Sequence, residues 1–310
     1  MKILLVFGVS VLIFLLSGGY YVFMKACHRE QELPWEDPAA LRATQWAPLA
    51  DRIEEGIRYL QDHNARDIVT CSNDGLKLRA RWLPAENPVG TILLFHGYRS
   101  CPLSDFAVVI PYCHSLGFNL LLADQRSHGN SEGRFITFGI HEHTDVLQWI
   151  EYHNEHIGLL PVYLAGMSMG ATTVLMAAGR ELPRNVRGVY ADCGFTDPKQ
   201  IIKEVMRQAH VPPIPLLNIA GWYTKLFAKF GLEDYSTVRA MESCRIPVLM
   251  VHGTADHFVP CHMSRQAFAA CKSEKQLILV EGASHGTGYL TDRIRCQQAL
   301  TEFLLSHLHN

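Results

Sequence analysis

The sequence predicts an α/β fold in which helices cover both faces of a mostly parallel sheet. Six short, almost wholly apolar runs alternate along the chain with longer stretches of helical periodicity. Strands buried on both faces of a parallel sheet read as such runs, and helices form the crossovers between them. We expect the strands at 91–95, 118–123, 162–165, 186–191, 247–251 and 277–280, and the helices near 104–116, 141–157, 169–181, 260–272 and 290–308.

A β-hairpin is predicted before these strands. The runs 68–72 and 76–83 read as strands and are separated by Asn73-Asp74-Gly75. An Asp-Gly pair between two strand-like runs is a strong hairpin signal. We therefore expect antiparallel strands at one edge of the sheet.

The composition suits one large folded domain with appendages. Of the 310 residues, 48% are hydrophobic and 19% are charged, which provides ample apolar surface for a core. The net charge is -2 and the isoelectric point is about 6.8. Since nucleic-acid binders carry basic patches and this chain has no long basic run, we expect no nucleic-acid partner.

The cysteines and histidines form no disulfide or metal-binding pattern. Nine cysteines are scattered without a Cys-x-x-Cys pair, at positions 27, 71, 101, 113, 193, 244, 261, 271 and 296. In the segment His141-Glu142-His143, a helix would turn the two imidazoles to different faces. We predict no metal ion and no cofactor, and we take the cysteines for buried or incidental thiols.

Residues 1–26 are predicted to form an uncleaved membrane anchor. The stretch 3–24 contains only apolar residues, Gly, Ser and Tyr, and it is long enough to span a bilayer as a helix. A cleaved signal peptide is the competing interpretation, but Ser17-Gly18-Gly19 is a weak cleavage site. The flanking charges are nearly balanced. The short amino-terminal tail favours an extracytoplasmic position of the folded domain, which we predict, whereas the many thiols favour the cytoplasm.

Residues 27–66 are predicted to be a connector with one amphipathic helix. The apolar stripe of this helix consists of Leu49, Ile53, Ile57 and Leu60. The opposite face mixes acidic and basic residues instead of forming a basic surface. We therefore expect the stripe to pack on the folded body rather than to lie on a membrane.

The α/β core is predicted at 67–194 and 241–310, with an inserted helical lid at 195–240. The inserted segment is too long for a single crossover helix. It contains three prolines, followed by the aromatic residues Trp222, Tyr223, Phe227 and Phe230. We expect the lid to cover the carboxyl edge of the sheet, with most of these aromatics packing it on the body and one or two lining an acyl pocket.

The motif that organises the chain is Gly166-Met167-Ser168-Met169-Gly170. It fits Gly-x-Ser-x-Gly, in which a serine occupies a sharp, strained turn between a strand and a helix. Gly166 and Gly170 allow the strand and the helix to approach closely. The Met169 N–H then lies at the positive end of the helix, where it can stabilise an oxyanion.

An acid and a histidine follow the serine in the required order. Asp256 comes just after the strand that ends at Val251, and His285 comes just after the strand that ends at Val280. Carboxyl ends of parallel strands share one edge, so both are expected beside Ser168. We predict that His285 takes the proton from Ser168 and that Asp256 orients the imidazole.

The second oxyanion donor is expected in the loop His96-Gly97-Tyr98. Gly97 permits a tight turn, and the Tyr98 N–H is the natural partner of the Met169 N–H. His96 is expected to organise this loop. Asp192 and Asp124 also follow strands, and we expect both to hold active-edge loops by hydrogen bonding while Asp256 serves as the acid.

Further motifs accompany these residues. They are His96-Gly97-Tyr98, Asp124-x-Arg126-x-His128-Gly129-x-Ser131-Glu132-Gly133, Ile136-Thr137-Phe138-Gly139, Ser168-Met169-Gly170-Ala171, Ala191-Asp192-Cys193-Gly194 and His252-Gly253-x-x-Asp256. Over residues 68 to 308 the chain resembles the α/β-hydrolase superfamily. More narrowly, it resembles the bacterial, membrane-anchored serine esterase or serine aminopeptidase-like branch. The resemblance implies the fold and the Ser-Asp-His triad but not the substrate.

The predicted function is hydrolysis of a small-molecule acyl ester. A serine at the elbow excludes chemistry that needs a carboxylate nucleophile there, and an alkoxide leaving group makes the least demand on the site. Two alternatives stay open. One is amidase or aminopeptidase activity, for which Glu204, Glu233 and Asp234 in the lid are candidate amine-binding residues. The other is a non-catalytic hydrolase-fold binding module.

Overall fold

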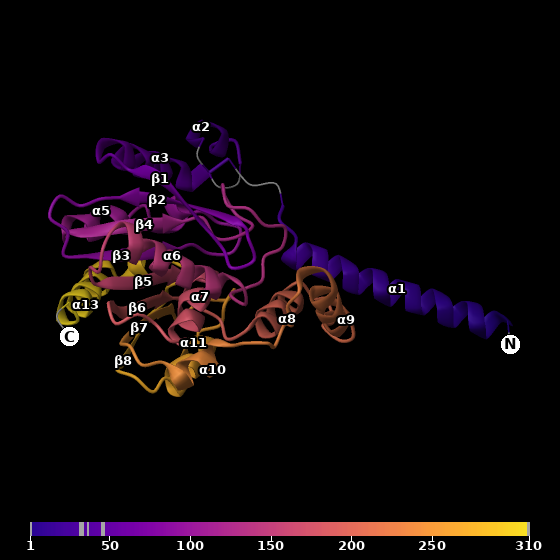
Figure 1. The fold of residues 1–310 in the computed structure, drawn as a ribbon. Coiled ribbons are helices and arrows are strands. Elements are labelled where there is room, and N and C mark those ends of the chain that lie inside the picture. The colour runs from indigo at the N-terminus through magenta and orange to yellow at the C-terminus, as the bar shows by residue number, and fades with distance from the viewer. Residues whose placement is uncertain (1, 31–33, 36, 45–46, 309–310) are drawn as a thin grey trace.

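A long helix projects from a layered α/β body (Figure 1). The computed structural model describes residues 2–30, 34–35, 37–44 and 47–308. The predicted connector, 27–66, therefore includes positions that lie outside the described residues, among them 31–33, 36 and 45–46. The helices are α1 (Lys2–Cys27), α2 (Pro38–Leu41), α3 (Ala47–Asp62), α4 (Pro102–Phe106), α5 (Val109–Ser115), α6 (Glu142–His156), α7 (Met169–Ala178), α8 (Pro198–Gln208), α9 (Leu216–Tyr223), the π-helix η1 (Thr224–Ala228), α10 (Thr237–Ser243), α11 (His262–Ala270), α12 (Gly288–Thr291) and α13 (Arg293–Ser306).

The body is built on an eight-stranded sheet of order β1-β2-β4-β3-β5-β6-β7-β8. The hairpin β1-β2 is antiparallel and joins the edge of β4, and all later neighbours pair in parallel. This arrangement confirms the predicted fold class and the position of the hairpin. The strands are β1 (Arg66–Cys71), β2 (Lys77–Leu83), β3 (Gly90–Phe95), β4 (Phe118–Ala123), β5 (Val162–Met167), β6 (Val186–Asp192), β7 (Val248–Gly253) and β8 (Lys275–Val280).

The strand predictions are confirmed, with small shifts at the ends. The central strands β3 and β4 are buried at every position, as their uniform apolar runs indicate. The edge strand β8 begins two residues earlier than predicted, because Lys275 and Gln276 are polar yet pair with β7. The first two residues of β8 are half-exposed and exposed, whereas the buried positions come near its end. The start of this strand therefore lacks an apolar pattern in the sequence.

Two predicted helices are each divided in two. The stretch 104–116 forms α4 and α5, and the stretch 290–308 forms α12 and α13. Pro111 lacks an N–H and cannot bond to the turn before it, which prevents one continuous helix through α4 and α5. The Asp292 side chain accepts from the Arg295 N–H, so it caps a new helix at α13.

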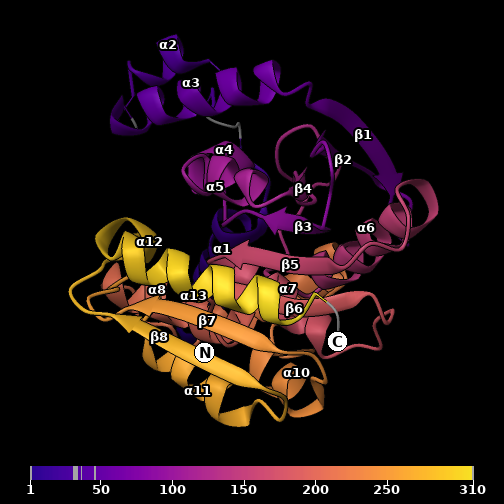
Figure 2. The same cartoon turned by 90° about the vertical axis from the view of Figure 1, so that its left-hand side faces the viewer.

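Helices cover both faces of the sheet. In β3, Ile92 and Leu94 face the layer of α3, α4, α5 and α13, whereas Leu93 and Phe95 face the layer of α6, α7, α10 and α11. Figure 2 shows α13 lying across the sheet on the first of these sides. The predicted stripe of α3 packs on this body, with Ile53 fully buried, so the expectation of ordinary packing is confirmed.

The segment between β6 and β7 is helical, as expected. It contains α8, α9 and η1, which lie beside α1 at one end of the body (Figure 1). The next helix, α10, packs against α7 and α11 beneath the sheet. The crossover helix of the sheet therefore begins at Thr237, four residues inside the range assigned to the insertion.

The helix α1 is long and apolar enough to cross a membrane, a property that a signal sequence would share. Its first two thirds expose large apolar side chains from Ile3 to Leu16. Its last third is built into the protein, because Phe23 and Cys27 are buried and the Cys27 carbonyl accepts from the Ile136 N–H at 2.7 Å. The boundary between helix and body thus lies near Ser17.

Candidate active site

Ser168 occupies a strained turn between β5 and α7. Its φ of 54° and ψ of -112° are costly for a residue with a side chain. A methyl group on Gly170 would overlap the Phe95 carbonyl, and one on Gly166 would overlap the Gly170 carbonyl. Both glycines are therefore needed for the close approach of strand and helix, as the motif predicts.

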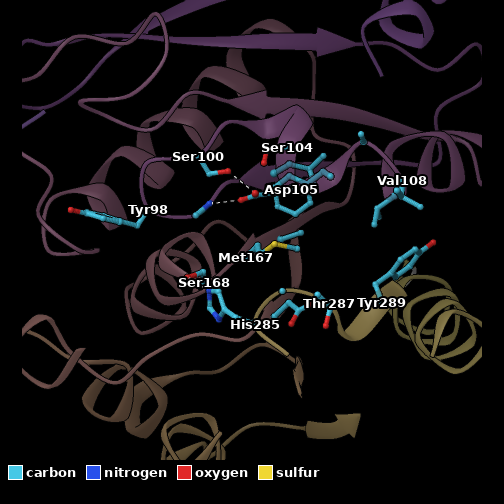
Figure 3. A pocket seen from close by; sticks show the side chains of 18 of the residues that line it. Tyr98, Ser100, Ser104, Asp105, Val108, Met167, Ser168, His285, Thr287 and Tyr289 are labelled. Carbon is cyan, nitrogen blue, oxygen red and sulfur yellow. Dashed lines mark hydrogen bonds between the residues drawn. The ribbon is translucent and has the colours of Figure 1, made fainter. Parts of the chain in front are cut away.

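Ser168, His285 and Asp256 form a continuous hydrogen-bonded series. The Ser168 Oγ atom lies 2.9 Å from His285 Nε2, and His285 Nδ1 lies 2.7 Å from Asp256 Oδ2. His285 reaches this position from the loop after β8, and Asp256 from the loop after β7. The structure thus brings together the three side chains that the sequence singles out, and Figure 3 shows Ser168 beside His285 at the pocket wall.

Asp256 is held as a carboxylate. Burial by itself would raise its pKa, but hydrogen bonds from His252 and His285 lower the pKa well below the usual range. The other carboxylate oxygen, Oδ1, accepts from the Phe258 and Val259 N–H groups at 3.0 and 2.8 Å. A fixed anion on this side of the imidazole sets which ring nitrogen carries the proton.

Asp192 and Asp124 are positioned differently from Asp256. The Asp192 main-chain oxygen accepts from the Ser168 N–H at 2.8 Å, so the end of β6 supports the elbow. Its carboxyl group is buried, its Oδ1 atom has no partner among the described residues, and burial raises its pKa to about 6. Asp124 accepts from the Asn130 N–H at 2.8 Å and holds the following loop.

The loop after β3 carries the Tyr98 N–H toward the elbow. A methyl group on Gly97 would lie 3.4 Å from Ser168 Cβ, which shows how close this loop is to the serine. Within the described part of the chain, neither the Tyr98 N–H nor the Met169 N–H donates to another protein group. Two unused donors beside a serine hydroxyl are what an oxyanion requires.

The fold of this loop depends on Asp105, which the sequence reasoning missed. Its carboxylate accepts from the Gly97 N–H and from the Ser100 hydroxyl, each at 2.6 Å (Figure 3). Asp105 is partly buried, and the removal of water from around its carboxyl group raises the pKa. The available signal was Pro102 at the start of a helix with an acid in its first turn. That pattern predicts a helix start but not what the acid binds.

His96 organises the same loop, as expected. The ring is fully buried, Nδ1 lies 2.8 Å from the Gly97 oxygen, and Nε2 accepts from the Gln125 N–H at 3.1 Å. Burial lowers the pKa of His96 to about 4, so the imidazole is neutral at ordinary pH. The His96 side chain thus links the end of β3 to the loop after β4.

The carboxyl end of α1 is bonded to this loop. The Tyr98 hydroxyl donates to the Ala26 carbonyl at 2.8 Å, and the Arg99 guanidinium donates to the Lys25 carbonyl at the same distance. Arg99 also pairs with Glu30 at 2.8 Å. A cation at the carboxyl end of a helix complements the helix dipole. The end of α1 therefore helps to fix the position of the Tyr98 backbone.

A cavity of about 910 Å³ extends from Ser168 between the sheet and the helices α4, α5 and α13. Most of its wall is apolar, and Figure 3 shows Val108 and Tyr289 facing each other at the end far from Tyr98. Apolar residues of the wall include Ile92, Leu94, Val108, Val109, Leu300 and Leu304. The structure describes every residue of the inserted segment 195–240, and no residue of this segment lines the cavity. The expectation that lid aromatics line an acyl pocket is therefore wrong for this cavity.

The acidic candidates for binding an amine do not reach this cavity either. Glu233 pairs with Lys199 at 2.8 Å, Asp234 accepts from the Gly231 N–H, and Glu204 lies 3.9 Å from Arg207. These are local contacts of the inserted segment itself.

Among the described residues, one group of side chains meets the spacing of metal ligands, and it overlaps the triad. The ligand atoms of Cys193, Asp256 and His285 lie within 4.8 Å of one another. Both His285 nitrogens are already engaged, and burial raises the pKa of the Cys193 thiol well above its usual value. A thiol that resists deprotonation is a poor metal ligand, so the donor set does not fit a metal centre.

A family model described as the alpha/beta hydrolase fold matches residues 90–214, which include β3, the elbow and α7. The protein has an α/β-hydrolase fold. Among solved structures, the esterase Pf2001 of Pyrococcus furiosus superposes with a TM-score of 0.65 at 20% identity, covering 80% of this chain and 95% of that one. Est1E from Butyrivibrio proteoclasticus, solved with ferulic acid, gives a TM-score of 0.62 at 22% identity, covering 78% and 100%.

Two curated relatives match most of the length of this chain. The uncharacterised protein YqkD of Bacillus subtilis is 28% identical over 228 residues, which are 71% of this chain and 72% of YqkD. The uncharacterised protein YfhR of Escherichia coli is 24% identical over 253 residues, which are 79% and 82% of the two chains. These likenesses bear on the fold, and the chemistry is argued from the site.

Proposed function

We propose that the protein is a serine hydrolase that cleaves carboxylic esters through an acyl-enzyme intermediate. The observation that carries this proposal is the hydrogen-bonded series of Ser168, His285 and Asp256 at the wall of a large apolar cavity. The esterases among the similar structures support the same class of reaction. An aminopeptidase is less well supported, because Glu204, Glu233 and Asp234 make local contacts and do not line the cavity.

The reaction has two steps, acylation of Ser168 and hydrolysis of the acyl-enzyme. His285 Nε2 takes the Ser168 proton as Oγ attacks the ester carbonyl, and Asp256 stabilises the resulting imidazolium. The Tyr98 and Met169 N–H groups donate to the oxyanion. The imidazolium then protonates the leaving alkoxide, which departs as an alcohol. Water attacks the acyl-enzyme with His285 as base, and the carboxylic acid leaves.

The apolar wall of the cavity favours an ester with an apolar acyl group. Its volume of about 910 Å³ lies at the upper end of the range of ordinary ligand sites, roughly 300–1,000 Å³. Aliphatic side chains from the sheet, α5 and α13 form part of its wall. An acyl chain that enters from Ser168 would be removed from water along most of its length.

We also propose that α1 anchors the protein as an uncleaved helix, in keeping with the membrane-anchored serine esterase or aminopeptidase-like branch, with the catalytic domain on the extracytoplasmic side. The exposed apolar side chains from Ile3 to Leu16 support a membrane partner. The burial of Phe23 and the bonds from Tyr98 and Arg99 to the end of α1 support retention of the helix.

A fluorophosphonate probe tests the hydrolase proposal. Such a probe reacts covalently with an activated serine, so the full-length protein should be labelled and Ser168→Ala should not. Ser104→Ala, which removes another hydroxyl from the cavity wall, is the matched control and should retain labelling. Equal labelling of wild type and Ser168→Ala, or no labelling of folded wild type, contradicts the proposal.

A further inference from the structure

An uncharged, apolar surface lies on the inserted segment next to α1. The stretch 211–222 contains no ionisable side chain. Three large side chains of this segment and η1 point to solvent: Ile214 is 73% exposed, Trp222 is 56% exposed and Phe227 is 48% exposed. Exposure of large apolar groups in one place marks an interaction surface rather than a random scatter.

This surface is continuous with the membrane-spanning candidate. Gly18 and Gly19 of α1 pack against Leu216 and Ile219 of α9 so closely that a methyl group on either glycine would overlap them. Aromatic rings continue the contact, with Phe23 stacked on Phe227 at 5.9 Å. In Figure 1 α9 runs beside the part of α1 that leaves the body.

The length of α1 shows how deep the contact lies. The part free of the body, from Ile3 to Ser17, provides about 15 residues, or roughly 22 Å of helix at about 1.5 Å per residue. A bilayer has a hydrocarbon core of about 30 Å and needs about 20 residues to span it. The span must therefore include the turn of α1 that packs on α9.

Charged residues border the apolar surface on both sides. Lys225 and Lys229 are exposed after α9, and Arg207 is exposed before it. A cationic border suits anionic lipid headgroups, and a tryptophan prefers the interface between hydrocarbon and headgroups. The pattern is that of a segment that lies in the plane of a membrane surface.

We propose that α9 and η1 lie in the interfacial layer of the lipid bilayer beside α1, with Trp222 in contact with lipid. The inference rests on the proposed anchor but not on the ester chemistry. It gives the inserted segment a role other than lining the acyl cavity, which agrees with its absence from the cavity wall.

Tryptophan quenching by brominated lipids tests the inference. The full chain is placed in vesicles of phosphatidylcholine and phosphatidylglycerol whose acyl chains carry bromine close to the headgroup. Bromine quenches only rings in contact with lipid, and Trp82 and Trp149 are buried in the body. Trp222→Phe should abolish most of the bromine quenching, whereas Trp82→Phe, the matched control, should leave the quenched fluorescence intensity unchanged.

Three outcomes would overturn the inference. Equal bromine quenching of wild type and Trp222→Phe removes the lipid contact. Protection of Trp222 from iodide without bromine quenching indicates that a second copy of the chain, and not lipid, covers the surface. Release of the protein from vesicles by alkaline carbonate removes the anchor as well. Fluorophosphonate labelling of the same vesicles reports separately on the hydrolase proposal.

Discussion

Two buried aspartates stand near His285, and their surroundings give them opposite chemistry. Asp256 accepts hydrogen bonds from His285 and two main-chain N–H groups and lies 3.2 Å from His252 Nε2, and these contacts lower its pKa. Asp192 is buried, its Oδ1 atom has no hydrogen-bond partner in the described part of the chain, and burial raises its pKa to about 6. The anion beside the imidazole is therefore Asp256, although both residues follow strand ends.

This difference predicts different effects on turnover. Asp256→Asn should lower kcat by about 10⁴-fold, because the amide presents the wrong group to His285 Nδ1 and favours the wrong tautomer. Asp192→Asn should retain kcat within about tenfold, because its contribution to the elbow is a main-chain bond. Steady-state hydrolysis of an aryl ester measures both. A large loss in Asp192→Asn with an active Asp256→Asn would reverse the assignment.

The raised pKa of Asp192 predicts that Asp192→Asn stabilises the protein in a pH-dependent way. The folded pKa of Asp192, about 6, lies above the unfolded value of 3.8, so the native state binds more protons between these values and stability falls as pH rises through this window. Asn does not titrate. Asp192→Asn should therefore be more stable than wild type above pH 6, by on the order of 1–3 kcal/mol, with the difference vanishing below pH 4. Thermal unfolding in detergent at pH 4 and pH 7.5 measures this, and equal Tm differences at both pH values would refute it.

At this scale the sequence predicts residues that belong to motifs and misses those that do not. Ser168, Asp256 and His285 are recognisable because a glycine motif and the order of strand ends define their positions. Asp105 belongs to a helix start with no fixed distance to the elbow. Its bond to Gly97 arises only when α4 folds back over the loop after β3.

At the scale of elements, the end of α1 and the loop after β3 act as one unit. Main-chain carbonyls at the end of a helix lack partners within the helix, and here Tyr98 and Arg99 supply them. The same loop carries the proposed oxyanion donor. The hydrogen bonds to the end of α1 therefore help to hold this donor in place.

Tyr98→Phe tests this connection. The substitution keeps the Tyr98 N–H and the ring that stacks on Phe138 but removes the bond to the Ala26 carbonyl. We expect kcat to fall about fivefold with KM nearly unchanged, since one such bond contributes about 1 kcal/mol. Tyr59→Phe, which removes a hydroxyl bonded to His114 away from the site, is the control. Equal kcat values for all three proteins would show that the bond does not position the loop.

Periodicity predicts most elements and fails where one side chain ends a helix. The apolar composition of β3 and β4 predicts their burial on both faces, whereas the breaks before α5 and α13 depend on single residues, Pro111 and Asp292. The start of α10 at Thr237 was hidden because a crossover helix and an inserted helix have the same periodicity.

At the scale of the whole molecule, the cavity joins segments that are far apart in sequence. Trp35 of the connector, Val108 before α5 and Leu300 of α13 all contribute to its wall. No local pattern marks such residues, because each reads as an ordinary core position. The sequence therefore suggested that one or two aromatic residues of the insertion line an acyl pocket, whereas no residue of 195–240 lines this cavity.

Narrowing the cavity should change the preferred length of the acyl group. Val108 faces Tyr289 across the end far from Tyr98 (Figure 3), so Val108→Trp should obstruct long acyl chains. Each excluded methylene costs about 0.8 kcal/mol, so kcat/KM for an octanoyl ester should fall at least tenfold while that for an acetyl ester changes little. Val69→Trp, on an exposed position of β1, is the control. A parallel loss with both esters would exclude the cavity as the acyl site.

The bonds between α1 and the active-site loop also bear on how the protein is prepared. A soluble form obtained by removing residues 1–30 would leave the Tyr98 hydroxyl and the Arg99 guanidinium without the carbonyls of Lys25 and Ala26 and without Glu30. It would also uncover the aromatic groups that stack on Phe23. Rates measured on such a fragment would describe a protein with a relaxed oxyanion loop, so the kinetic reference for this hydrolase fold is the full-length chain in detergent or lipid.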